Sequence, residues 1–241
     1  MAVTAADKRR STEIVKRLRR AYPEAHCALE FNDPLQLLIA TILSAQCTDV
    51  RVNMVSPVLF RKYPTAAALA AAERKDIERI ILSTGFFRSK AKSIQGCCEK
   101  LVAEHDGHVP RTLEELIKLP GVGRKTANVV LGTAYGIATG IVVDTHVARI
   151  SRRLGLTKKN DAVKIEQDLM AQIPQRDWID FSHEMIFHGR AICIARRPKC
   201  EICPLEPICP RIGVEERGEG RGVRGERTRK RKPRFSSNNG R

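Results

Sequence analysis

The chain has 241 residues, enough to bury a sizeable core in one large domain or in two small lobes. Its 43 Lys and Arg against 27 Asp and Glu give a formal net charge of +16, which favours a polyanionic partner. The uncharged stretch over residues 127–143 is too short and too polar for a membrane span, and no export signal precedes the first charged segment. We therefore expect a cytoplasmic, nucleic-acid-binding protein without a membrane partner.

Helical periodicity recurs along the chain, and convincing strand alternation is found nowhere. These patterns predict an all-α fold of roughly ten helices. In chain order we expect an amphipathic, basic helix over 8–20, a core helix over 35–43 after Asn32-Asp33-Pro34, a helix capped by Asp49, an alanine-rich helix after Thr65, and one through Ile77 that Ser83-Thr84-Gly85 stops. Further helices are expected from about Arg124, after Asp144, after Asp161 and around Trp178.

A predicted hairpin lies between two of these helices, where the sequence reads LPGVGRKTA. Thr112 and Glu115 have the spacing of a capping box, so a short helix should run from there to Leu119. The following proline and glycines, Gly121 and Gly123, would end it, because proline lacks an amide donor and glycine tolerates positive φ. Free backbone amides beside the positive end of the next helix would form an anion site able to hold a nucleic-acid phosphate.

Four of the eight cysteines form a cluster near the C-terminus, with the spacing Cys-x6-Cys-x2-Cys-x5-Cys. These are Cys193, Cys200, Cys203 and Cys209. Four thiolates in a short loop bind either zinc or an iron–sulfur cluster, and spacing alone leaves both open. The other four cysteines stand alone and are expected to be small buried hydrophobic residues.

The hairpin LPGVGRKTA, the later run VDTHVARI, the segment LSAQCTD at 43–49 and the cysteine spacing together resemble the endonuclease III family of helix-hairpin-helix DNA glycosylases. The resemblance reaches from about Asn32 to Cys209 and implies two helical lobes with a [4Fe–4S] cluster on the four cysteines. One lobe would comprise 28–135, with the hairpin at 112–135, and the other 1–27 with 136–210. The remainder, 211–241, carries eleven Lys or Arg against four Glu, and its composition predicts a disordered basic tail.

The resemblance also implies a role for individual residues. Lys125 matches the family's nucleophile and Asp144 its essential carboxylate. Gln46 would enter the gap left by an extruded base, Phe86 would act as a wedge, and Arg88 and Lys90 would contact the backbone. The expected DNA-binding set is Gln46, Phe86, Arg88, Lys90, Gly121, Val122, Gly123, Arg124, Thr126 and His146.

A lysine at the nucleophile position implies the bifunctional branch, which removes damaged, oxidised pyrimidines from duplex DNA and cleaves the abasic site by β-elimination. Arg124 and the positive end of the second hairpin helix should disfavour the charged form of this lysine. Two alternatives stay open: a pyrimidine-dimer glycosylase of the same family, and a non-catalytic DNA-binding module. We expect a monomer that acts on damaged or abasic double-stranded DNA in a bacterial cytoplasm, associated with the nucleoid.

Overall fold

The structure, a computed structural model, describes residues 3–214, so most of the expected basic tail lies outside the described residues. Within 3–214 there are helices and no strands, which confirms the all-α prediction. The α-helices are α1 Ala5–Ala21, α2 Pro34–Leu43, α3 Asp49–Lys62, α4 Ala66–Ala70, α5 Arg74–Ile81, α6 Phe87–His105, α7 Leu113–Leu116, α8 Arg124–Tyr135, α9 Thr145–Arg153, α10 Ala162–Gln172 and α11 Trp178–Ala191.

Short polar side chains start many of these helices, because their oxygens accept hydrogen bonds from amides that lack a partner in the first turn. Asp33 caps α2 by accepting from the Gln36 amide at 2.8 Å, and Asp161 caps α10 in the same way. The prediction that Asp49 caps α3 is wrong, because Thr48 occupies that position and accepts from the Arg51 amide.

The first hairpin helix is shorter than predicted. Thr112 caps α7 as expected, but the α-helix ends at Leu116 rather than at Leu119. The next residues continue in turns, with the Leu119 amide donating to the Leu116 carbonyl at 3.1 Å. The second hairpin helix begins at Arg124, as the sequence predicts.

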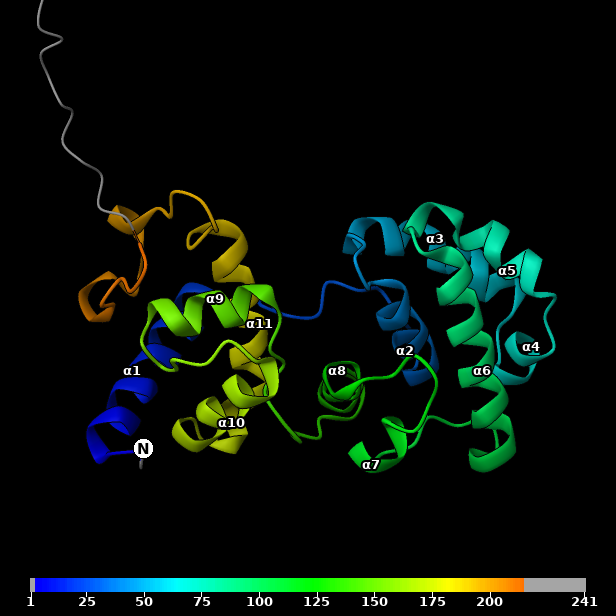
Figure 1. Ribbon diagram of the computed structural model, residues 1–241, viewed down its shortest axis with the longest axis horizontal. Coiled ribbons are helices and arrows are strands. Elements are labelled where there is room, and N and C mark those ends of the chain that lie inside the picture. Colours follow the sequence, from blue (N-terminus) through cyan, green and yellow to red (C-terminus); the bar gives the residue numbers. More distant parts are fainter. Residues whose placement is uncertain (1–2, 215–241) are drawn as a thin grey trace, which may run out of the picture.

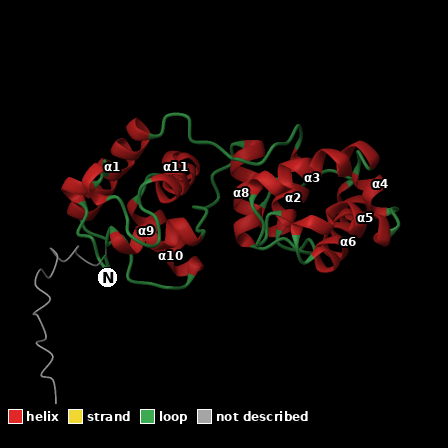
Figure 2. Ribbon diagram, turned by 90° about the horizontal axis from the view of Figure 1, so that it is seen from above, coloured by secondary structure: helices red, strands yellow, loops and turns green. Residues whose placement is uncertain are grey.

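The helices form two groups that lie side by side, each around its own apolar core (Figures 1 and 2). The first core is built mainly by α2 to α8, with Leu38 and Ile94 among its fully buried side chains. The second is built by α1, α9, α10 and α11, and includes Ile14 and Phe181. Helix α1 therefore packs with the C-terminal half of the chain although it comes first in the sequence.

No helix among residues 3–214 is long and apolar enough to cross a membrane.

Candidate active site and cysteine loop

The hairpin between α7 and α8 depends on one glycine for its shape. Gly121 has φ +77°, and a Cβ added there would lie 2.6 Å from the Cβ of Ser93 on α6. Gly123 differs, because its φ is −92° and open space surrounds it, so the turn does not use the positive φ that glycine tolerates at this position. Gly121 is thus required by the turn, whereas the absence of a side chain at Gly123 leaves the hairpin surface open.

Helix α8 starts without a side-chain cap, because its N-cap residue is Gly123. Its first amides and that of Gly121 have no hydrogen-bond partner among the described residues. The amide of Val122 differs, since it donates to the Leu119 carbonyl at 3.1 Å while the side chain is buried in the first core. Val122 therefore shapes the hairpin from inside, and neither its amide nor its side chain is free for the DNA contact that the sequence analysis expected of this residue.

Lys125 is the second residue of α8 and is exposed. Its ammonium makes no hydrogen bond or ion pair with any residue in the part of the chain that the structure describes. The positive end of the α8 dipole lies at the same turn. An amine in this position is accessible to a ligand held by the hairpin amides.

Arg124, the neighbour of Lys125, points to the second group of helices. Its Nε donates to Glu166 Oε2 at 2.7 Å and its Nη2 to Oε1 at 3.2 Å, and Asn128 donates to the same carboxylate at 2.8 Å. The Glu166 side chain is 5% exposed, so this bidentate pair offsets much of the guanidinium charge. Arg124 consequently does not provide the free positive charge next to Lys125 that the sequence led us to expect, and it is not free for a phosphate.

Asp144 is the N-cap of α9, with Oδ1 accepting from the Val147 amide at 2.8 Å. Its side chain is half-buried, and no hydrogen bond or ion pair joins it to Lys125 within residues 3–214. His146 follows one residue into the helix and lies 3.2 Å from Arg149 through its Nδ1. Its ring packs closely against α11, since a Cβ added at Gly189 would lie 2.7 Å from it.

Two exposed side chains stand on backbone in the left-handed region. Gln46 has φ +51° in the turn between α2 and α3, and Phe86 has φ +46° at the start of α6. Non-glycine residues adopt this conformation at a cost and do so preferentially at functional sites. Phe86 is 66% exposed, while its neighbour Phe87 packs against the first core.

The two basic residues in the first turn of α6, Arg88 and Lys90, differ from each other. Arg88 is exposed and lies over the Phe87 ring, 5.3 Å from its centroid. Lys90 is only 5% exposed and its Nζ donates to the Thr84 carbonyl at 2.8 Å, while burial lowers its pKa. The expected contact with the DNA backbone is therefore wrong for Lys90, because its ammonium is buried and closes the protein turn before α6.

Predicted site residues from the two groups of helices are joined through α11. Arg190 of α11 pairs with Asp49 at the start of α3 at 2.7 Å, close in sequence to Gln46. The preceding residue, Gly189, contacts His146 at the start of α9. Two adjacent residues of α11, Gly189 and Arg190, thereby connect the segment after Gln46 with the start of α9, where Asp144 is the cap.

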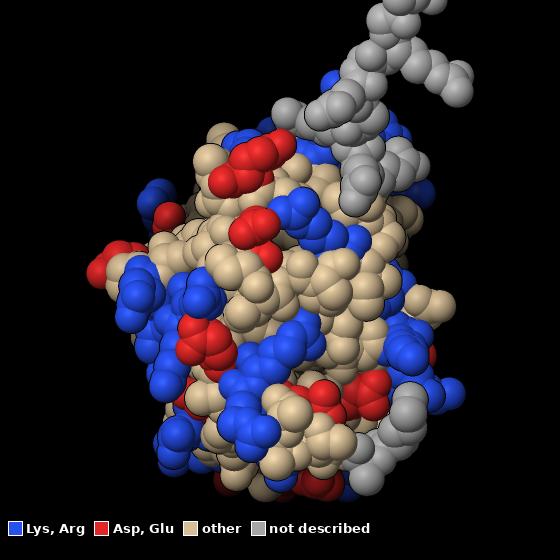
Figure 3. Space-filling view, turned by 90° about the vertical axis from the view of Figure 1, so that its left-hand side faces the viewer, with Lys and Arg blue, Asp and Glu red and all other residues tan. Residues whose placement is uncertain are grey.

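The four clustered cysteines line a single pocket at the end of the second group of helices. Three of them pack against the second core. Basic side chains anchor the loop through its carbonyl groups: Arg149 donates to Cys193 at 2.8 Å, Arg153 to Ile194 at 2.8 Å, Arg17 to Pro204 at 3.2 Å and Arg10 to Ile208 at 3.3 Å. Figure 3 shows lysine and arginine side chains spread over this end of the molecule.

The four sulfurs line one pocket, as is needed for a cluster that takes one thiolate on each of four irons. Within 3–214 no three Cys, His, Asp or Glu side chains are grouped closely enough to hold one metal ion. In a four-iron cluster each thiolate binds a different iron, so the sulfurs surround a volume instead of converging on one atom. Burial raises the pKa of the Cys203 thiol to about 11, so its thiolate needs the positive charge that a bound metal supplies.

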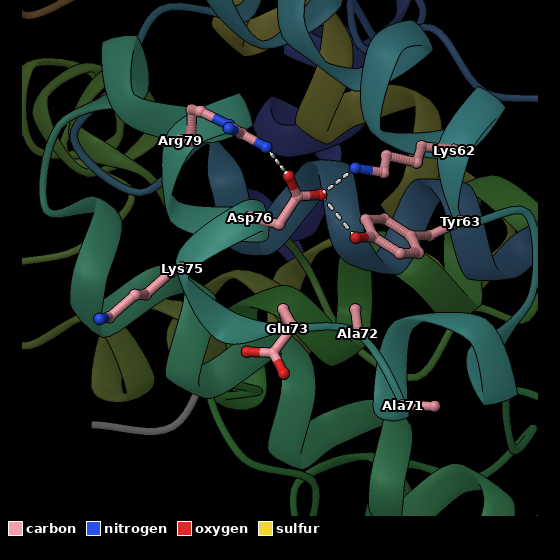
Figure 4. A pocket seen from close by; sticks show the side chains of 8 residues that line it. All are labelled: Lys62, Tyr63, Ala71, Ala72, Glu73, Lys75, Asp76 and Arg79. Atoms are coloured by element: carbon pink, nitrogen blue, oxygen red, sulfur yellow. Dashed lines mark hydrogen bonds and ion pairs between the residues drawn. The ribbon is translucent and has the colours of Figure 1, made fainter.

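An open pocket of about 570 Å³ elsewhere holds none of the predicted site residues (Figure 4). Asp76 occupies its centre and accepts hydrogen bonds from Lys62, Tyr63 and Arg79, an arrangement that lowers the pKa of the carboxyl group. The Asp76 carboxylate is thus occupied by these three partners, and the pocket brings together none of the residues that the sequence analysis assigned to the site.

Known protein families match the two segments that contain the hairpin and the cysteine loop. Residues 39–175 match the HhH-GPD superfamily of base excision DNA repair proteins, and residues 193–209 match the iron-sulfur binding domain of endonuclease III. Endonuclease III of a Synechocystis strain is 59% identical over 206 residues, covering 86% of this chain and 94% of that protein. The chain belongs to the endonuclease III family. Its cofactor is accordingly a [4Fe–4S] cluster, and the matched segment, residues 193–209, contains all four clustered cysteines.

More distant relatives and solved structures of endonuclease III also match this chain over most of its length. Endonuclease III of Escherichia coli K12 is 40% identical, covering 84% of this chain and 96% of that protein. A non-covalent endonuclease III–DNA complex superimposes with a TM-score of 0.80 at 44% identity, covering 85% and 95% of the two chains. A trapped endonuclease III–DNA covalent intermediate gives 0.81 at 44% identity, covering 85% and 96%. The family's helix-hairpin-helix glycosylase fold is therefore confirmed for this chain.

Sequence reasoning missed the residues that support the site from a distance. Glu166 and Asn128 fix Arg124, and Tyr22 and His188 lie behind the cysteine loop. A buried carboxylate on the apolar face of α10 was a usable signal for Glu166, because such a group needs a partner. Nothing in the local pattern identifies Tyr22, which is 166 residues from its partner His188.

Proposed function

We propose that this chain is a base-excision-repair DNA glycosylase and abasic-site lyase that removes damaged, above all oxidised, pyrimidines from double-stranded DNA through Lys125. The observation that carries the proposal is the exposed Lys125, whose ammonium has no partner in the described chain, directly after an uncapped hairpin. Endonuclease III, the family of this chain, has been captured as a covalent intermediate with DNA, which supports an amine nucleophile.

The reaction needs a neutral amine at Lys125 and an acceptor for its proton. Nζ attacks C1′ of the damaged nucleotide, and the C1′–N bond breaks with its electron pair leaving on the base, which gains a proton. Nζ loses one proton to the acceptor, and the C1′–O4′ bond then opens with its electron pair on O4′, which takes up a proton to become a hydroxyl, leaving a protonated Schiff base between Nζ and C1′. Removal of a C2′ proton then expels the 3′ phosphate as the C3′–O bond breaks. Asp144 is assigned as the base and as the stabiliser of positive charge on the sugar.

The remaining residues hold DNA. The amides of Gly121, Gly123 and the first turn of α8 bind phosphate oxygens. Thr126, next to Lys125, and His146, two residues after Asp144, contact the DNA beside the two catalytic residues. Gln46 and Phe86, both exposed and on strained backbone, fill the space left by the extruded nucleotide. Arg88 adds an exposed cation at the same corner as Phe86. Extrusion costs a few kcal/mol, less for a poorly stacked base, so selection of damage begins at this step.

We assign the DNA cleft to the boundary between two lobes, 28–135 and 1–27 with 136–210. The two separate apolar cores and the ion pairs Asp49–Arg190 and Arg124–Glu166 that cross between them support this division. We further propose that the protein acts as a monomer on the bacterial chromosome in the cytoplasm. Size-exclusion chromatography with light scattering tests the monomer, and a dimer mass would contradict it.

A panel of duplexes, each with one lesion or an abasic site, tests the proposed activity. Base release followed by β-elimination is expected for oxidised pyrimidines and strand scission for the abasic site. Release from pyrimidine dimers alone would support the dimer-specific alternative. Tight binding without scission of the abasic duplex would show that the chain is a non-catalytic DNA-binding module.

A further inference from the structure

Tyr22, His188 and Cys203 form a hydrogen-bonded series that ends on a cluster ligand. Tyr22 follows α1, and its hydroxyl lies 2.9 Å from Nδ1 of His188 on α11. The other ring nitrogen, Nε2, lies 3.6 Å from the sulfur of Cys203. His188 is 1% exposed and lines the same pocket as the four cysteines.

The chemistry of a bound cluster fixes the direction of both hydrogen bonds. An iron-bound thiolate has no proton, so the Cys203 sulfur can only accept, and Nε2 of His188 must carry the hydrogen. The hydrogen-bond partners of this buried ring are a phenol and a sulfur, neither of which is a carboxylate that would favour an imidazolium. A neutral ring protonated at Nε2 presents a lone pair at Nδ1, so Tyr22 donates to it. Tyr22 therefore selects the His188 tautomer that points an N–H group at the sulfur.

An N–H donor at a cluster sulfur stabilises the more reduced, more negative state of the cluster, because it withdraws electron density from the thiolate. We propose that Tyr22 and His188 are positioning residues that raise the reduction potential of the [4Fe–4S] cluster by holding one N–H donor against Cys203. This inference rests on the cluster and its ligands, and it is independent of the proposed glycosylase chemistry.

A purely structural role has a different signature. The Tyr22 and His188 rings meet edge to face, with centroids 5.7 Å apart at 66°, and this contact alone would join α1 to α11. Tyr22→Phe keeps the ring contact and removes only the hydroxyl group. A potential that changes in this variant is explained by the hydrogen bond and not by packing.

The experiment measures the reduction potential of the cluster couple in the full-length, cluster-loaded protein by voltammetry, with iron content and absorbance near about 400 nm as checks on loading. Tyr22→Phe is expected to shift the potential to a more negative value at unchanged iron content. His188→Leu, which removes the donor, should shift it further, and His188→Gln, which can present an amide N–H, should restore it toward the parent value. The matched control is Tyr63→Phe, which removes a hydroxyl bonded to Asp76 in the other group of helices and should leave the potential unchanged.

Potentials of Tyr22→Phe and His188→Leu equal to those of the parent and of Tyr63→Phe would overturn the proposal. If His188→Leu does not retain its cluster, Tyr22→Phe decides the question alone. Scission of an abasic duplex is measured in parallel. An unchanged potential in a protein that cleaves contradicts only this inference, whereas absent cleavage in a protein with a shifted Tyr22→Phe potential contradicts only the proposed function.

Discussion

Asp144 has two separable roles, because it caps α9 and is also assigned to catalysis. Asparagine caps helices about as well as aspartate, whereas alanine at an N-cap loses about 0.5–2 kcal/mol. Asp144→Asn should therefore keep near-normal stability and lose most base excision, while Asp144→Ala should lose both. Thermal denaturation and single-turnover base release measure the two effects. An Asp144→Asn protein that excises normally would reduce this residue to a cap.

Individual residues divide into those that the sequence could assign and those that it could not. The caps at Asp33, Thr65 and Asp161 depend on the few residues around them, so local pattern was sufficient. Lys90 and Arg124 look like free cations in the sequence, but folding gives each a buried partner: the Thr84 carbonyl of the preceding turn for Lys90, and Glu166 of a distant helix for Arg124. Resemblance identified Lys125, which periodicity alone would have left as a surface lysine.

At the scale of elements, the hairpin contains a matched pair of glycines with different requirements. Gly121→Ala should destabilise the fold by about 1–3 kcal/mol, because alanine is strained at φ +77° and its Cβ would collide with Ser93. Gly123→Ala should cost no more than about 1 kcal/mol, the preference for glycine over alanine at an N-cap, since its φ of −92° suits alanine and nothing lies near the new Cβ. It should nevertheless weaken duplex binding, because the methyl group would stand where a phosphate approaches the amides.

Denaturant unfolding and duplex affinity, measured side by side for both variants, test this account of the hairpin. Parent-like DNA affinity in a stable Gly123→Ala protein would show that phosphate does not bind against this glycine.

The packing of α1 on α11 predicts a pH dependence of stability. Glu184 is 3% exposed, Arg19 reaches only one of its oxygens at 3.4 Å, and the other has no partner among the described atoms. Burial raises the pKa of Glu184 from 4.5 to about 7. The folded state therefore binds the Glu184 carboxyl proton more tightly than the unfolded state does. The protonated carboxyl group contributes to the free energy of unfolding below pH 4.5, and this contribution is lost as the pH rises through about 7.

Glu184→Gln should accordingly remove part of the decline in unfolding free energy between pH 5 and pH 8. Since one pKa unit corresponds to about 1.4 kcal/mol, the difference between parent and variant should grow by up to roughly 3 kcal/mol across this range. Denaturant titrations of both proteins at the two pH values give the result. Parallel pH profiles would contradict the burial argument.

At the scale of the whole molecule, contacts between distant segments set the geometry of the site. Asp49 and Arg190 are 141 residues apart, and Arg124 and Glu166 are 42 apart, yet both pairs connect the two groups of helices. Periodicity predicted the helices and the absence of strands in the described chain, but it contains no information on which helices share a core. The assignment of α1 to the C-terminal group came from resemblance, and the ion pairs between the groups came only from the structure.

The central claim is that Lys125 is the amine that attacks the damaged nucleotide, and reductive trapping tests it most directly. Borohydride added during turnover on a lesion-containing duplex reduces the Schiff base to a stable protein–DNA adduct, which peptide mapping by mass spectrometry can locate. The account predicts one adduct, on Lys125, and none with Lys125→Gln, which should still bind the duplex through the hairpin. A Lys125→Gln protein that traps as efficiently as the parent, or an adduct on another amine, would contradict it.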